Sequence, residues 1–197
     1  MTIKLGLTGS IGMGKSTTAA MFAEAGCDLW DADAAVHRLY AAGGAAVSPM
    51  QVAFPDAIRD GTVSREALKA IITEDPGALP RIEAIVHPLV AQDRAAFIAQ
   101  STADIVVLDI PLLFETGGQA RVDATVVVSV PEDVQRARVL ARGTMTEDQF
   151  EQIKAKQMPD AEKRARADYV IITDTVEHAR AQVHSVIADV TDRFGDA

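Results

Sequence analysis

The stretch Gly9-Ser10-Ile11-Gly12-Met13-Gly14-Lys15-Ser16 decides the fold, because it matches the phosphate-binding pattern G-x-x-x-x-G-K-[ST]. A strand-like apolar run, residues 3–8, precedes it, and a run of helix-forming composition, residues 17–25, follows it. The motif therefore lies at a strand-to-helix turn, which is the context that it requires. In such a loop, backbone N–H groups point inward and the helix N-terminus adds partial positive charge, so we expect it to hold polyphosphate oxygens. The alternative is a Gly-rich turn with an incidental Lys-Ser, which both flanks disfavour.

The loop predicts distinct roles for its residues. Lys15 is expected to reach the outer phosphates, and the Ser16 hydroxyl is expected to be a ligand of a magnesium ion that bridges phosphate oxygens. Thr17 would add a contact to the inner phosphate. The remaining nucleotide-binding positions are those whose backbone forms the loop: Gly9, Ile11, Gly12, Met13 and Gly14.

Composition limits the class of protein. The 197 residues are 48% hydrophobic and 24% charged, which is typical of one globular domain, here with an inserted subdomain. The formal net charge of -9 disfavours nucleic acid or an anionic membrane as the main partner. Cys27 is the only cysteine and is expected in the core, and neither a signal peptide nor a membrane-spanning run is evident. We therefore expect a cytoplasmic protein that is a monomer or a weak homo-oligomer.

Four further apolar runs predict strands at residues 27–30, 104–110, 124–130 and 169–173. Helical segments separate them: Pro131 opens one helix, the pair Thr146 and Gln149 matches a capping box, and residues 176–193 form a closing amphipathic helix. This alternation predicts an α/β protein, with a five-stranded parallel sheet and helices on both faces.

Residues 34–100 differ from the rest of the chain. Their pattern is helical, without a convincing strand, and is interrupted at Gly61, at His87-Pro88 and at other breaks. This stretch is longer than a crossover between two strands needs. We interpret it as a helical insertion that closes over a second substrate.

Three acids follow predicted strands and are therefore expected at the edge of the sheet where ligands bind. Asp31 and Asp33 end the second strand and would share a face if the strand stays extended there; we take Asp33 as the catalytic base. One or both could instead cap the following helix. Asp109 ends the third strand, where an acid supports magnesium through water in many P-loop proteins, or it begins the turn at Pro111.

Cations gather after the fourth strand in this otherwise acidic chain. Such clusters are usually solvated helix faces. Arg138 and Arg142 are four residues apart, so they share a helix face and are candidates to meet phosphate or stack on a base. The cluster comprises Arg136, Arg138, Arg142, Lys154, Lys156, Lys163, Arg164 and Arg166.

Several segments together resemble the dephospho-CoA kinase family over nearly the whole chain. Beside the P-loop, these are the D-A-D at 31–33, the H-P-L at 87–89, the D-I-P-L-L-F-E at 109–115 and the A-D-Y-V-I at 167–171. The resemblance implies a fold like that of nucleoside monophosphate kinases. It also implies transfer of the ATP γ-phosphate, with magnesium, to the ribose 3′-hydroxyl of dephospho-CoA.

The resemblance further implies roles for particular residues. Asp33 would be the base, with Lys15 and Arg142 as further catalytic residues and Arg138 on the ATP. Asp31, His87 and Leu112 would contact the acceptor. Residues 34–100 would form the CoA-binding insertion and residues 138–157 a lid. From its own surroundings in the sequence, His87 reads first as a residue at a joint between two helices.

The chain departs from the family pattern at three places: Ile172-Thr173-Asp174 stands where an Asp-Asn pair is frequent, Gly143 follows Arg142, and residues 41–60 match poorly.

The rival interpretations of the function are weaker. A kinase similar to shikimate kinase would lack the Pro-Leu-Leu-Phe-Glu run and the long insertion. A GTP-dependent switch would need an N/T-K-x-D motif, which the chain lacks, and a regulatory module would need no acceptor base.

Overall fold

The computed structural model describes residues 2–195 and contains the expected five-stranded sheet. Its strands are β1 (Ile3–Thr8), β2 (Asp28–Asp31), β5 (Ile105–Asp109), β6 (Ala124–Ser129) and β7 (Tyr169–Ile172), in the order β2-β5-β1-β6-β7. The central strand β1 pairs in parallel with β5 and β6, and β6 with β7. The α/β fold with a parallel sheet is confirmed.

The register of the sheet brings the phosphate-binding loop and Asp109 to the same edge of the sheet. Leu7 of β1 lies beside Asp109 of β5, and Thr8 lies beside Val127 of β6. The loop that follows β1 therefore starts at the same edge at which Asp109 ends its strand. In parallel sheets this carboxyl edge is where ligands bind.

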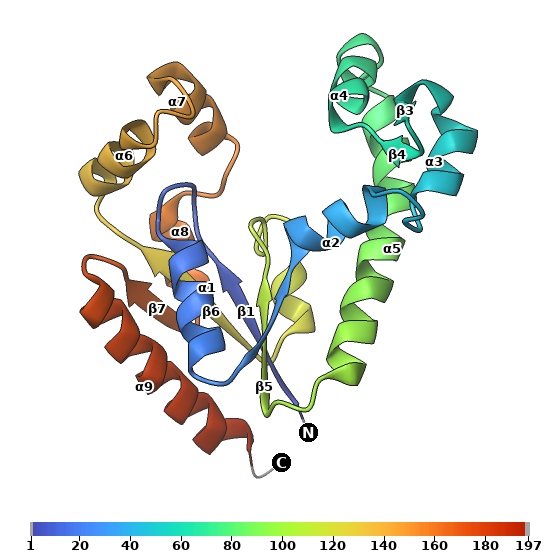
Figure 1. The fold of residues 1–197 in the computed structure, drawn as a ribbon. Helices are drawn as coiled ribbons and strands as arrows, with labels where there is room; N and C mark the ends of the chain where they lie inside the picture. Colours follow the sequence, from blue (N-terminus) through green and yellow to red (C-terminus); the bar gives the residue numbers. More distant parts are fainter. Residues whose placement is uncertain (1, 196–197) are drawn as a thin grey trace. The chain divides into compact units, whose positions relative to one another are not determined.

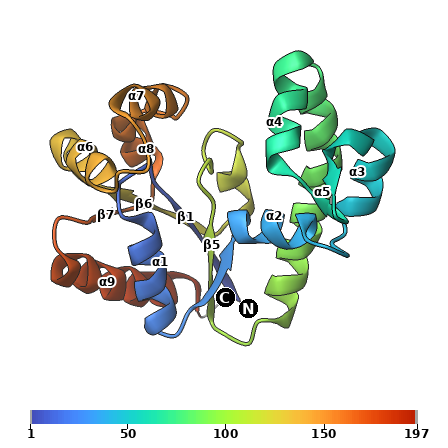
Figure 2. The ribbon, with the colours of Figure 1, turned by 45° about the horizontal axis from the view of Figure 1, so that its top comes forward.

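Helices α1 (Lys15–Glu24) and α9 (Val176–Phe194) pack against each other and against the sheet (Figure 1; Figure 2). The main core lies between these two helices and the sheet. It includes Leu5, Leu7 and Phe22, each of which is fully buried. Cys27 belongs to this core, and burial followed by the charge of Asp28 raises the pKa of its thiol to about 11. The expected core role of Cys27 is thus confirmed.

Three helices follow β6 and precede β7: α6 (Glu132–Ala141), α7 (Glu147–Ala155) and α8 (Asp160–Arg166). Figure 1 shows α6 and α7 side by side beyond the end of β6, and α8 packs against β6. The predicted capping box is present, because Thr146 accepts from the backbone of Gln149 and Gln149 from that of Thr146. A short 3-10 turn, η2 (Gly118–Arg121), lies in the connection from β5 to β6.

The chain divides into two compact units: residues 31–100, and residues 2–30 with 101–195. The first unit contains a core of its own, which includes Met50, Phe54 and Ile82. Its elements are α2 (Ala32–Tyr40), α3 (Val47–Ala53), η1 (Pro55–Ala57), β3 (Ile58–Arg59), β4 (Thr62–Val63), α4 (Arg65–Glu74) and α5 (Ala78–Gln100).

Two expectations for this unit were wrong. Residues 58–63 form a small antiparallel hairpin, whereas no strand was expected. Its turn contains Asp60 and Gly61, both with positive φ, which is the mark of a tight hairpin turn. Helix α5 runs unbroken through His87 and Pro88, so His87 is not at a helix joint. One proline removes one backbone hydrogen bond, and the packing of Ile82 and Val86 holds the helix together.

Candidate active site

The P-loop shape depends on glycine at two positions. Gly12 and Gly14 have φ values of 78° and 89°, a backbone conformation that L side chains rarely adopt. A Cβ on Gly12 would also lie 2.5 Å from Val139 Cγ2 and 3.1 Å from the Gln135 carbonyl oxygen. Gly14 is the N-cap of α1 and has no side chain with which to cap it. The first-turn amides of α1 are therefore suited to bind an anion.

Lys15, the first residue of α1, forms an ion pair with Asp109 at the end of β5. The Asp109 side chain is 4% exposed and that of Lys15 is 18% exposed. At the end of β5, Asp109 is a buried carboxylate that pairs with the P-loop lysine and so orients it.

A cavity of about 180 Å³ lies beside the P-loop. Its walls are Thr17, Thr18 and Met21 of α1, Arg138 and Arg142 from the end of α6, and the connection from β7 to α9 at residues 173–176. Arg138 and Arg142 do share a face, as their spacing predicts. A cavity that continues from a phosphate-binding loop has the position expected for the base and ribose of a nucleotide.

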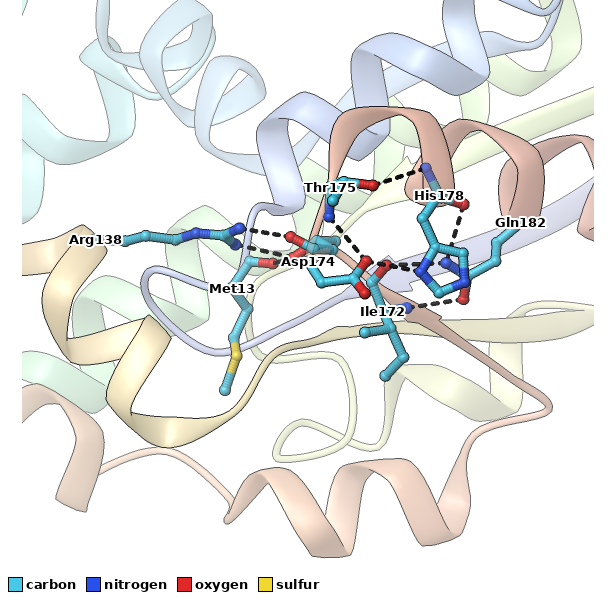
Figure 3. Close-up of polar contacts among 8 residues, drawn as sticks. Met13, Arg138, Ile172, Asp174, Thr175, His178 and Gln182 are labelled. Atoms are coloured by element: carbon cyan, nitrogen blue, oxygen red, sulfur yellow. Dashed lines mark hydrogen bonds and ion pairs between the residues drawn. The ribbon is translucent and has the colours of Figure 1, made fainter.

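Arg138 is anchored at the end of β7 (Figure 3). Its Nη1 donates to Thr173 Oγ1 at 3.1 Å, and its Nη2 donates to the Thr173 carbonyl oxygen at 2.5 Å. Thr173 Oγ1 in turn donates to the Met13 carbonyl oxygen at 2.6 Å. Thr173 thus connects α6 to the P-loop, at a position where the chain departs from the family pattern.

The neighbouring Asp174 is the acidic group of this cavity wall (Figure 3). Its Oδ1 accepts from the Thr175 N–H at 2.8 Å and lies 2.7 Å from His178 Nδ1. The hydrogen bond from His178, followed by that from Thr175, lowers the pKa of Asp174. The carboxylate therefore stays charged at neutral pH, although both side chains are half-exposed.

The two acids of the D-A-D do not share a strand face as expected. Strand β2 ends at Asp31, whose Oδ1 accepts from the Ala34 N–H at 2.8 Å and so caps α2. Asp33 lies in the first turn of α2, and it is exposed. The capping interpretation therefore holds for Asp31. The turn into helix begins earlier than expected because the Asp31 side chain satisfies one of the first amides.

The other predicted residues fall in different environments. His87 is an exposed residue of α5, and Leu112 follows β5 with 42% of its surface exposed. Most partners of the cation cluster are acids: Arg136 pairs with Glu147, Lys154 with Glu132, and Arg166 with Glu162. Lys163 is fully buried against Glu115. The interpretation of the cluster as solvated helix faces does not predict this burial.

Sequence reasoning missed Thr173 and Asp174 as cavity residues, and it missed the glutamines Gln135 and Gln157 on the P-loop. For Thr173 a signal existed, because it follows a strand at the carboxyl edge of the sheet. For the glutamines there was none, since a glutamine inside or after a helix is usually solvated. Within residues 2–195, no group of three acids, histidines or cysteines is placed to hold a metal ion, and no helix is long and apolar enough to cross a bilayer.

Together, the loop at a strand-to-helix turn, the oriented lysine and the adjoining cavity define a P-loop nucleotide-binding protein. A family model for dephospho-CoA kinase matches residues 3–178. Dephospho-CoA kinases from Ruegeria pomeroyi and Cereibacter sphaeroides are 69% and 62% identical, with 96% and 95% of each chain covered. A crystal structure of a Thermus thermophilus protein has a TM-score of 0.86 at 34% identity, over 96% of this chain and 98% of that one.

The chain belongs to the dephospho-CoA kinase family. It is an enzyme that phosphorylates dephospho-CoA with ATP in the final step of CoA biosynthesis. The resemblance on which the sequence analysis relied is therefore confirmed.

Proposed function

We propose that this kinase transfers the γ-phosphoryl group to the ribose 3′-hydroxyl of dephospho-CoA, with Asp33 as the base and Lys15 as the group that neutralises charge. Phosphoryl transfer depends on positioning and on charge neutralisation, and the oriented Lys15 beside an uncapped helix N-terminus supplies both. That arrangement is the observation that carries the proposal. Arg138 and Arg142 are proposed to hold the nucleotide from the opposite wall of the cavity.

The choice of Asp33 over Asp31 rests on their different environments. The Asp31 carboxylate is engaged as a helix cap, whereas Asp33 is exposed in the first turn of α2. The acceptor hydroxyl must lose its proton as the phosphoryl group arrives, and Lys15 is already engaged in an ion pair with Asp109. An exposed carboxylate that follows β2 is suited to accept this proton. His87 and other residues of the 31–100 unit are proposed to contact the acceptor, and so is Leu112.

Magnesium is proposed to accompany ATP. A magnesium ion on a nucleotide keeps several waters and takes only one or two protein oxygens. Ser16, exposed in the first turn of α1, and the buried carboxylate of Asp109 are oxygen donors of that kind, so the residues present fit the ion. When bound, it would neutralise charge on the phosphate oxygens. The protein's own part is to hold Lys15 against Asp109 and to keep the loop curved.

We further propose that the enzyme works in the cytoplasm as a monomer or weak homo-oligomer, without a nucleic-acid or membrane partner. The net charge of -9 supports this, since phosphate backbones and anionic lipids attract basic surfaces.

The test compares Asp33→Asn with the matched variant Asp31→Asn. Asparagine cannot accept the proton, so Asp33→Asn is expected to lose about 10²- to 10⁴-fold in turnover while ATP affinity stays the same. Asparagine also caps helices, so Asp31→Asn is expected to cost about 0.5 kcal/mol of stability and little turnover. Product mass and phosphorus NMR report transfer to the 3′-hydroxyl, and calorimetry reports ATP affinity. If Asp31→Asn abolishes transfer and Asp33→Asn does not, the base assignment is wrong.

A further inference from the structure

Two glutamines hold one residue of the P-loop from outside the loop. The Ile11 N–H donates to Gln157 Oε1 at 3.2 Å, and the Ile11 carbonyl oxygen accepts from Gln135 Nε2 at 2.7 Å. Gln135 belongs to α6 and is 2% exposed, while Gln157 lies in the connection from α7 to α8. Both backbone polar groups of Ile11 are thus bound by side chains more than a hundred residues away in the sequence.

Ile11 occupies a sensitive position, because residues 10–13 form a turn. The Met13 N–H donates to the Ser10 carbonyl oxygen at 3.2 Å. Gly12, the third residue of the turn, has φ 78°, whereas Ile11 is not among the residues with positive φ. This combination is that of a type II turn. Type I and type II turns differ by a half-rotation of the central peptide, which here joins Ile11 to Gly12.

The bond from Gln135 determines which way this central peptide faces. The peptide is trans, so its carbonyl and its N–H point in opposite directions. Because the Ile11 carbonyl oxygen is held toward α6 by Gln135, the Gly12 N–H is directed away from α6. Gln157 fixes the preceding N–H and thereby prevents Ile11 from rotating with the peptide. A flip would break the bond from Gln135 and leave a buried carboxamide without its acceptor, which is costly.

We propose that Gln135 and Gln157 are positioning residues that hold the Ile11–Gly12 peptide so that the Gly12 N–H faces the terminal phosphates of the nucleotide. P-loops bind phosphate through inward-pointing backbone amides, so the direction of this N–H contributes directly to affinity for the phosphate chain. Gln135 lies just before residues 138–157, and Gln157 is the last residue of that segment. Movement of that segment would therefore reach the phosphate site through the Ile11 peptide. The proposal rests on the phosphate-binding role of the loop, and not on the choice of base.

The test uses inorganic tripolyphosphate, ADP and adenosine as calorimetric probes of the whole enzyme. Gln135→Glu keeps the shape but replaces the donor with an acceptor that repels the Ile11 carbonyl oxygen. Gln157→Met keeps the length and removes the acceptor. Each variant is expected to bind tripolyphosphate and ADP about tenfold more weakly and adenosine with unchanged affinity. In kinetic assays, the KM for ATP should rise while that for dephospho-CoA stays the same.

Gln182→Met is the matched control (Figure 3). Gln182 also bridges backbone, because its Oε1 accepts from the Ile172 N–H and its Nε2 donates to the Ile172 carbonyl oxygen, both at 2.9 Å. Its replacement should lower the Tm without changing tripolyphosphate affinity. Amide NMR of labelled Gly12 should show one signal in the native enzyme, and a shifted or doubled signal in Gln135→Glu.

Each outcome decides the proposal. Loss of tripolyphosphate affinity in both P-loop variants, with the control unaffected, supports it. Affinities within twofold of the native enzyme, or an equal loss in Gln182→Met, overturn it. A loss in only one P-loop variant overturns the role of the other glutamine. Because Gln135 is buried, a failure of Gln135→Glu to fold leaves the partly exposed Gln157 to decide. Unchanged polyphosphate binding overturns the proposal even where turnover is lost, because a loss of turnover alone would concern the catalytic base of the proposed function.

Discussion

At the scale of single residues, the pair of Lys15 and Asp109 combines a proposed catalytic function with a structural one. Asp109 is almost fully buried, and a buried carboxylate that loses its cation is destabilising. An alanine at position 15 therefore changes more than the charge next to the phosphates. The effect of Lys15 on stability has to be measured separately from its effect on phosphoryl transfer before a loss of activity is assigned to the chemical step.

We predict that Lys15→Ala lowers turnover by at least about 10²-fold and also lowers the Tm, while the fold persists. The double variant Lys15→Ala with Asp109→Asn should recover much of the Tm, because no buried charge remains, but it should not recover turnover. Steady-state kinetics and thermal unfolding measure the two effects. Recovery of turnover in the double variant would show that Lys15 acts mainly by balancing Asp109.

At the scale of elements, a buried ion pair joins α8 to the segment after β5. Lys163 Nζ lies 2.9 Å from Glu115 Oε1, and its side chain is 0% exposed. The contact is an ion pair without the geometry of a well-aligned hydrogen bond. Glu115 also accepts from the Met158 N–H at 2.9 Å. Burial by itself would raise the pKa of Glu115, but the contacts with Lys163 and Met158 outweigh it, and the net pKa is lowered.

Glu115→Gln is expected to reduce the free energy of unfolding by about 3 kcal/mol at pH 7, because Lys163 is left buried without its counter-charge. Replacing both residues, as Glu115→Gln with Lys163→Met, should recover most of this loss. Because folding lowers the pKa of Glu115, its contribution is present above the unfolded value of about 4.5 and is lost as the pH falls through the folded value. Urea unfolding between pH 7 and pH 3 should show the native enzyme losing its advantage over Glu115→Gln only as the pH falls below about 4.5; an advantage unchanged down to pH 3 would contradict this.

At the scale of the whole molecule, the proposed roles assign ATP to the cavity beside the P-loop and dephospho-CoA to the 31–100 unit. Hydrogen exchange can follow each of them. ATP alone is expected to slow exchange in the P-loop and at residues 173–179, and dephospho-CoA alone in the 31–100 unit. Slower exchange at residues 138–157 is expected only when both substrates are present, because closure excludes water once the site is filled. Equal protection of residues 138–157 by ATP alone would contradict a lid that responds to both.

The sequence by itself determined the parallel sheet, the P-loop and the family, because these depend on local patterns. A buried parallel strand reads as a continuous apolar run, and a phosphate loop needs glycines and Lys-Ser at fixed spacing. Helix α9 and the capping box on Thr146 were predictable for the same reason. The D-A-D was found, but its division between a cap at Asp31 and an exposed Asp33 was not, since that depends on where the strand stops.

Only the tertiary structure decided which polar side chains are buried and what they contact. Lys163 reads as one of several surface cations, yet it lies fully buried against Glu115, which is 48 positions earlier. Gln135 and Gln157 read as ordinary helical residues, yet they bind the backbone of Ile11. Pro88 reads as a break, yet the core of its unit keeps α5 continuous. In each case the deciding energy comes from partners distant in the sequence, which no local pattern encodes.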